Sequence, residues 1–75
     1  MVKVYLNVDG MMCSMCEAHV NDAVRKTTKI KKVKSSRKKK ETIIVMDGRK
    51  DLGLVINAIK SLGYDCSLNK IEELS

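Results

Sequence analysis

The sequence predicts an α+β fold in which two helices cover one face of a four-stranded antiparallel sheet. Three observations predict it. Apolar and polar residues alternate with a period of two near the N-terminus, two later stretches carry apolar residues at helical spacing, and the other apolar runs are short. A chain of 75 residues makes one small domain with a thin core. We therefore interpret residues 1–75 as a single domain.

The N-terminal part is expected to run from a strand through a loop into a helix. The strand covers Val2–Val8, and Gly10 allows a tight turn in the loop that follows it, residues 9–13. The helix covers residues 14–27. Ser14 is the expected N-cap, and Glu17 three residues later completes the pattern of a capping box. The buried helix face is predicted from the spacing of Cys16, Val20, Ala23, Val24 and Thr27.

The rest of the chain predicts two strands, a second helix and a last strand. The strands cover residues 30–36 and 41–46, joined by a turn at 37–40 that holds neither Gly nor Asn. The helix covers 51–62 with Gly63 at its C′ position, and residues 64–68 form the last strand, which 69–75 either extend or leave frayed. This βαββαβ order is that of a ferredoxin-like sandwich. It places Gly63 and Tyr64 near the first loop.

Two cysteines in this first loop are the candidate metal ligands. Cys13 and Cys16 are three residues apart where the loop enters the helix, so their side chains share one side of its first turn. The free N–H groups and the dipole at a helix N-terminus favour thiolate. A thiolate pair suits Cu(I), Zn(II) and similar thiophilic ions. Two buried thiols or a redox dithiol are the alternatives, whereas a structural zinc site needs a second ligand pair.

Four further residues are weighed as additional ligands or contacts. Cys66 on the last strand is interpreted as a core residue, with a third metal ligand or a dimer-bridging thiol as the alternative. His19 is interpreted as a solvated side chain, although it could reach a metal from the next helical turn. Met12 is a candidate thioether ligand, and Met15 is either a partner contact or a plain loop residue.

Charge is distributed unevenly along the chain. The formal charge is +6, and residues 25–40 hold ten of the fifteen Lys and Arg residues and none of the nine acids. This strip is either a solvated face that protects an edge strand or a docking surface for an acidic protein domain. An anionic membrane or a nucleic acid is the remaining alternative. Nucleic acid is disfavoured, because only Tyr5 could offer an aromatic ring on the open sheet face.

The sequence also indicates where the protein works. The N-terminus lacks the continuous apolar segment of a signal peptide, and no apolar run is long enough to span a membrane. We therefore expect the cytoplasm, where thiols stay reduced. Three cysteines is an odd number, which argues against a disulfide framework.

These features together resemble the heavy-metal-associated domain family, which includes small bacterial copper chaperones and the metal-binding modules of copper-transporting P-type ATPases. The resemblance rests on the segment Gly10-Met11-Met12-Cys13-Ser14-Met15-Cys16 after an alternating strand, on the βαββαβ order, and on Gly63-Tyr64 before the last strand. It implies that Cys13 and Cys16 bind the metal, that Met11 packs under the loop, and that Tyr64 lies beside the site.

The implied function is that of a soluble metallochaperone rather than an enzyme. Cu(I) would be bound as a dithiolate and passed by thiolate exchange to a copper-transporting P-type ATPase or its Cys-x-x-Cys domain. A metal-bridged homodimer remains open. Met12 stands where copper-binding members commonly have Thr and zinc- or cadmium-binding members have Asp. Met12 brings no carboxylate for a divalent ion, which favours Cu(I), while a carrier or sensor for zinc, cadmium or mercury stays the alternative. Thr28-Lys29 and Lys40 stand where members often have Gly.

Overall fold

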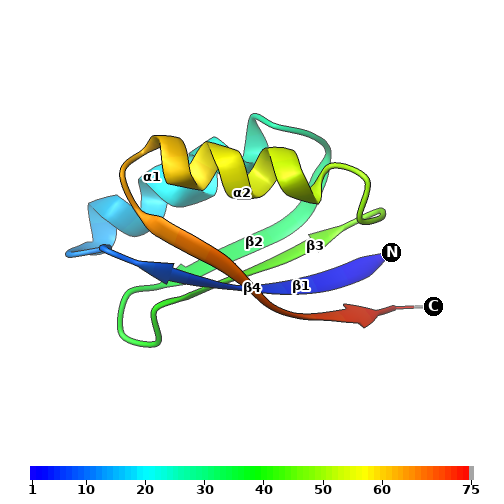
Figure 1. Cartoon of the computed structure of the whole chain (residues 1–75), viewed down its shortest axis with the longest axis horizontal. Helices are drawn as coiled ribbons and strands as arrows, with labels where there is room; N and C mark the ends of the chain where they lie inside the picture. The colour runs from blue at the N-terminus through cyan, green and yellow to red at the C-terminus, as the bar shows by residue number, and fades with distance from the viewer. Residues whose placement is uncertain (75) are drawn as a thin grey trace.

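The computed structural model describes residues 1–74 and confirms the predicted fold. All neighbouring strands are antiparallel, and their order across the sheet is β2-β3-β1-β4. Both helices lie on one face of this sheet, and the other face is uncovered (Figure 1). The elements are β1 (Val2–Asp9), α1 (Ser14–Arg25), β2 (Ile30–Ser36), β3 (Glu41–Met46), α2 (Leu52–Ser61) and β4 (Asp65–Glu73).

The core lies between the helices and the sheet. Strand β1 crosses its centre, and its four apolar residues at even positions are all buried. They meet Val20 and Val24 of α1 and Val55 and Ile59 of α2, each of which is fully buried. Burial of such a side chain contributes about 1.5–3 kcal/mol to the free energy of unfolding.

No helix within residues 1–74 is both long and apolar enough to cross a bilayer.

The structure shifts several predicted element bounds by one or two residues and decides two points that the sequence left open, the extent of the last strand and the buried face of β3. Helix α1 ends at Arg25 rather than Thr27, because the N–H of Thr27 already bonds to the carbonyl of Val24 in a tighter last turn. Strand β4 extends through Glu73, so residues 69–73 continue the strand, with Glu73 paired to Val2. In β3 the structure buries the even-numbered residues and leaves Ile43 and Val45 on the open face of the sheet.

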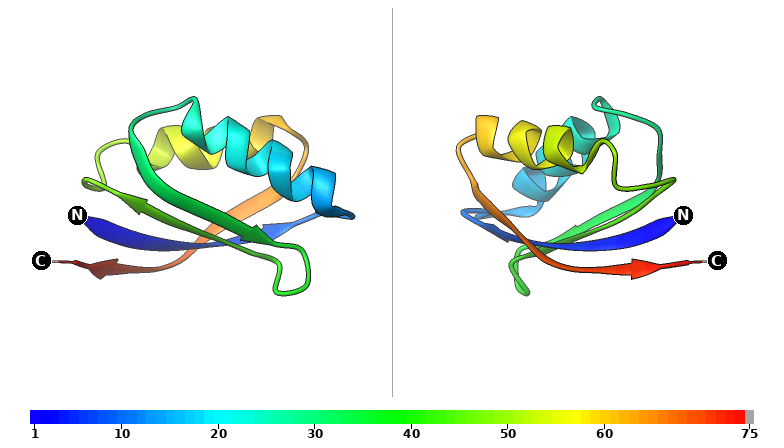
Figure 2. Two further views of the ribbon diagram at one scale, coloured as in Figure 1. Left: turned by 180° about the vertical axis from the view of Figure 1, so that it is seen from behind. Right: turned by 45° about the vertical axis from the view of Figure 1, so that its right-hand side comes forward.

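The turn between β2 and β3 is anchored to the end of β1. Lys40 adopts a left-handed conformation with φ of 53°, at the position where glycine was expected from the family pattern. Its carbonyl accepts a hydrogen bond from the N–H of Val8 at 2.9 Å, and its ammonium lies 3.8 Å from a carboxylate oxygen of Asp9. The hairpin is therefore held against the strand that leads into the cysteine loop, on the side of the sheet seen below the helices in Figure 2.

Candidate metal centre

The cysteine loop opens at one end of the molecule, opposite the chain termini (Figure 1). Cys13, not Ser14, is the N-cap of α1: its backbone is extended at φ −156° and ψ 175°, and its carbonyl accepts the N–H groups of Cys16 and Glu17 at 3.0 and 3.3 Å. The predicted capping box does not form. The carboxylate of Glu17 instead accepts a hydrogen bond from the backbone N–H of Arg37 at 2.7 Å. This loop-to-helix junction points both cysteine side chains to the same side.

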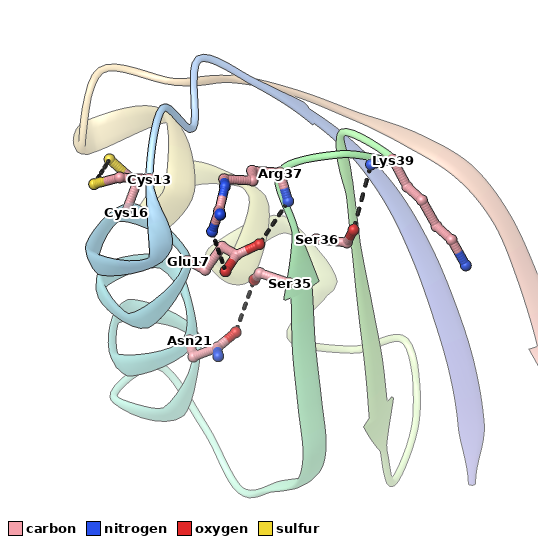
Figure 3. Close-up of polar contacts among 8 residues, drawn as sticks. All are labelled: Cys13, Cys16, Glu17, Asn21, Ser35, Ser36, Arg37 and Lys39. Atoms are coloured by element: carbon pink, nitrogen blue, oxygen red, sulfur yellow. Dashed lines mark hydrogen bonds and ion pairs between the residues drawn. The ribbon is translucent and has the colours of Figure 1, made fainter.

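The two sulfur atoms lie side by side. The Sγ atoms of Cys13 and Cys16 are 3.8 Å apart, and both residues are free thiols (Figure 3). Cys13 is exposed, while Cys16 is half-buried against the core. The structure therefore brings together the two residues that the sequence singled out, and it leaves one of them open to solvent. The pair is accessible to an ion and to a second protein.

Thiolate is favoured at Cys16. Hydrogen bonding from the Tyr64 side chain lowers the pKa of Cys16 to about 7, with further help from the backbone N–H groups near Met12 and Cys13. The same contact raises the pKa of the Tyr64 hydroxyl. A pKa of about 7 leaves about half of this thiol ionised at neutral pH. Metal binding requires the deprotonated sulfur, so the proton to be displaced is already weakly held.

Tyr64 is positioned by the glycine that begins the loop. Gly10 has φ of 111°, and a Cβ atom placed on it would lie 3.0 Å from Cδ1 of the Tyr64 ring. The ring thus packs directly over the loop backbone. Met11 is buried in the core beneath the loop, as the family resemblance implies. The prediction from topology that Tyr64 lies near the cysteines is correct.

The other candidate ligands are not brought into the site. Cys66 is buried in β4 opposite Val8, and burial raises the pKa of its thiol. His19 is exposed on α1, and Met12 and Met15 are exposed by 85% and 66%. Within residues 1–74, no three or more His, Cys, Asp or Glu side chains are grouped as a metal cluster. The sequence interpretation of Cys66 as a core residue agrees with its position.

A chain of polar contacts ties the cysteine-bearing helix to the β2–β3 hairpin (Figure 3). The Glu17 carboxylate accepts a hydrogen bond from the backbone N–H of Arg37 and also forms an ion pair with the Arg37 guanidinium at 3.4 Å. One turn further along, Asn21 accepts a hydrogen bond from the Ser35 hydroxyl at 2.7 Å, and Ser35 lies 3.0 Å from the hydroxyl of Thr42. Sequence reasoning missed these contacts, because partners 14 and 20 residues apart leave no local signal.

The donor set limits the chemistry. Two thiolates without a third protein ligand suit ions that accept two soft sulfur donors, such as Cu(I) or Hg(II). A closed tetrahedral zinc site requires four ligands, which this part of the chain does not assemble.

The chain is similar in sequence and in fold to known proteins. The model of the heavy-metal-associated domain matches residues 5–65. Copper chaperone CopZ of Enterococcus hirae is 31% identical over 68 residues, which cover 89% of this chain and 99% of CopZ. Mercuric reductase of Shewanella putrefaciens is 33% identical over 61 residues, which cover 81% of this chain but only 11% of the reductase. The solution structure of the yeast copper transporter domain Ccc2a, described in apo and Cu(I)-loaded states, superposes with a TM-score of 0.84 at 26% identity, covering 93% of this chain and 97% of that domain.

Proposed function

The chain belongs to the heavy-metal-associated domain family, and from this premise we propose that residues 1–75 act as a cytoplasmic Cu(I) metallochaperone domain. Cys13 and Cys16 carry the ion as a dithiolate, and a copper-transporting P-type ATPase, or its Cys-x-x-Cys domain, receives it. The observation that supports this most directly is the sulfur pair itself, 3.8 Å apart at the start of α1, with the pKa of one thiol lowered to about 7.

The proposed transfer is ligand exchange rather than enzymatic turnover. A thiolate of the partner attacks the ion on the open side of the pair and forms a shared intermediate with three sulfur ligands. One sulfur of this chain then leaves and takes up a proton. The second thiolate of the partner's Cys-x-x-Cys pair displaces the other sulfur of this chain, which is protonated in turn. Cys13 is the more exposed of the two, so it is the first that a partner thiolate meets. Cys16 is held beside Tyr64, which stabilises its thiolate during the exchange.

Anaerobic titration tests the site. The protein competes with a chromogenic Cu(I) chelator, and Cys13→Ser and Cys16→Ser are each expected to abolish effective competition. Cys66→Ala is the matched control, because it removes the buried thiol that lies outside the pair and should leave Cu(I) affinity unchanged. Unchanged affinity in Cys13→Ser would contradict the assignment. Transfer is then followed by intact-complex mass spectrometry after mixing with a Cys-x-x-Cys domain, which also reports any metal-bridged dimer.

A carrier for mercury or another thiophilic metal is the second candidate. It is favoured by the similarity to a short segment of a mercuric reductase. Hg(II) also accepts two thiolates, so ligand number alone does not separate it from Cu(I). Parallel titration with Cu(I), Zn(II) and Hg(II) distinguishes the candidates. Retention of Zn(II) or Hg(II) in the presence of competing Cu(I) would favour the second candidate over the first.

A further inference from the structure

The open face of the sheet carries lysines around an apolar centre. The even-numbered residues of β1 and β3 fill the core, so the odd-numbered residues of both strands face away from the helices. The strand register then aligns two rows across the sheet. From β2 to β4 they read Lys34, Ile43, Tyr5, Lys70 and Lys32, Val45, Lys3, Glu72. We call these eight residues the lysine face; it bears four ammonium groups and one carboxylate.

A shallow groove runs along this face. It has a volume of about 400 Å³, and its floor is formed by Ile43 and Val45. Its other lining residues are Lys3, Lys32, Lys34 and Leu74. Both floor residues are half-buried rather than fully exposed. The groove therefore combines an apolar floor with a cationic rim, an arrangement that attracts amphipathic, negatively charged surfaces.

The aromatic ring on this face is already occupied. The Tyr5 hydroxyl donates a hydrogen bond to Glu72, and the ammonium groups of Lys70 and Lys3 lie 4.6 and 5.3 Å from the ring centroid. Proteins that bind single-stranded nucleic acid on such a sheet stack bases on free aromatic rings. Aliphatic Ile43 and Val45 offer no ring for stacking. These contacts disfavour nucleic acid and leave a charged surface that offers no free aromatic ring to a base.

We propose that the lysine face docks the protein on a bilayer that contains anionic phospholipids. The lysine ammoniums pair with headgroup phosphates, while their stems and the groove floor lie against the headgroup region. The cysteine loop lies at one end of the molecule rather than on this face (Figure 1). It stays accessible in the docked state, so this inference goes beyond the proposed metal transfer and does not depend on it.

Sedimentation with phospholipid vesicles tests the proposal. Wild type is expected to bind vesicles of phosphatidylcholine mixed with phosphatidylglycerol, to ignore pure phosphatidylcholine, and to dissociate as salt is raised. Each lysine near an anionic surface contributes about fivefold to partitioning, so Lys32→Gln/Lys34→Gln should weaken binding by about 25-fold. Lys26→Gln/Lys60→Gln removes the same charge from two exposed positions on the helix layer, the C-cap of α1 and the last turn of α2, and is the matched control. Equal losses in the two double variants would overturn the proposal, because net charge alone would explain binding.

Two further readouts keep the test independent of variant folding. Acetylation of wild type followed by mass spectrometry should show Lys32 and Lys34 protected by anionic vesicles and Lys60 unprotected; the reverse pattern overturns the proposal. Binding of a labelled single-stranded oligonucleotide without vesicle binding would assign the face to nucleic acid instead. Cys13→Ser/Cys16→Ser should bind vesicles like wild type. Failure of metal transfer and failure of membrane docking are thereby distinguished.

Discussion

Gly10→Ala is the most informative single substitution near the metal loop. At φ of 111° an alanine backbone is strained by about 1–3 kcal/mol. The new Cβ would also lie 3.0 Å from Cδ1 of Tyr64, so the ring must shift by a few tenths of an ångström. A domain of this size has a free energy of unfolding of about 4–11 kcal/mol, so the variant should still fold. The shifted hydroxyl then supports Cys16 less well, and the pKa of that thiol rises above 7.

Two assays on the same variant check this reasoning. Thermal unfolding should show a Tm lower by about 4–8 °C per kcal/mol lost, and alkylation of Cys16 against pH, resolved by mass spectrometry, should give its pKa. Gly53→Ala is the control. Gly53 lies in the first turn of α2, and beyond its own helix backbone and chain neighbours an added Cβ would meet no atom within 4 Å, so the variant should be more stable by up to about 1 kcal/mol and leave the pKa of Cys16 unchanged. A folded Gly10→Ala protein whose Cys16 pKa stays at about 7 would refute the link through Tyr64.

Four other substitutions separate the contacts around the loop. Tyr64→Phe should raise the pKa of Cys16 and slow its alkylation at pH 7 several-fold, with no difference above about pH 9. Because the folded-state pKa of this thiol is depressed, the stability that its thiolate contributes at high pH is lost as the pH falls through about 7. The variant should lack this pH dependence of stability. Lys40→Gly should stabilise by about 0.5–1 kcal/mol in urea unfolding, since glycine removes left-handed strain, and a lower midpoint would contradict this. Arg37→Gln should lower the free energy of unfolding less than Glu17→Ala, because it keeps the hydrogen bond from the Arg37 backbone N–H to Glu17 and loses only an exposed ion pair worth about 0–1 kcal/mol. The opposite order of urea midpoints would show that the guanidinium carries the contact.

Local patterns predicted the fold wherever the pattern itself is buried. The period-two alternation of β1 and the apolar stripe of α2 gave correct elements because each side chain meets the core. The C-terminal half of β4 is different. Residues 69–73 are mostly polar, and they continue the strand through partners at the other end of the chain, as in the hydrogen bond from Tyr5 to Glu72. Sequence-local reasoning could not distinguish this pairing from fraying.

The sulfur pair was predictable for a similar reason. Spacing of three residues at a helix start determines which side both thiols occupy, and strand order alone placed Tyr64 nearby. The N-cap was not predictable: Ser14 and Glu17 satisfy the local rule for a capping box, yet Glu17 binds the backbone of Arg37, twenty residues away. The contact of Gly10 with the Tyr64 ring likewise depends on atomic positions rather than on sequence pattern.

The placement of the third thiol is what keeps the proposed site suited to exchange. Cys16 and Cys66 are chemically identical, yet Tyr64 and backbone N–H groups lower the pKa of the first, while burial raises the pKa of the second. A protonated thiol does not ligate a soft ion until it loses its proton. Cys66 therefore stays in the core as a small apolar side chain, and only Cys13 and Cys16 would remain to hold the proposed ion. A third protein thiolate would occupy the position that a partner's sulfur must enter, so the burial of Cys66 matters to transfer as much as the exposure of Cys13.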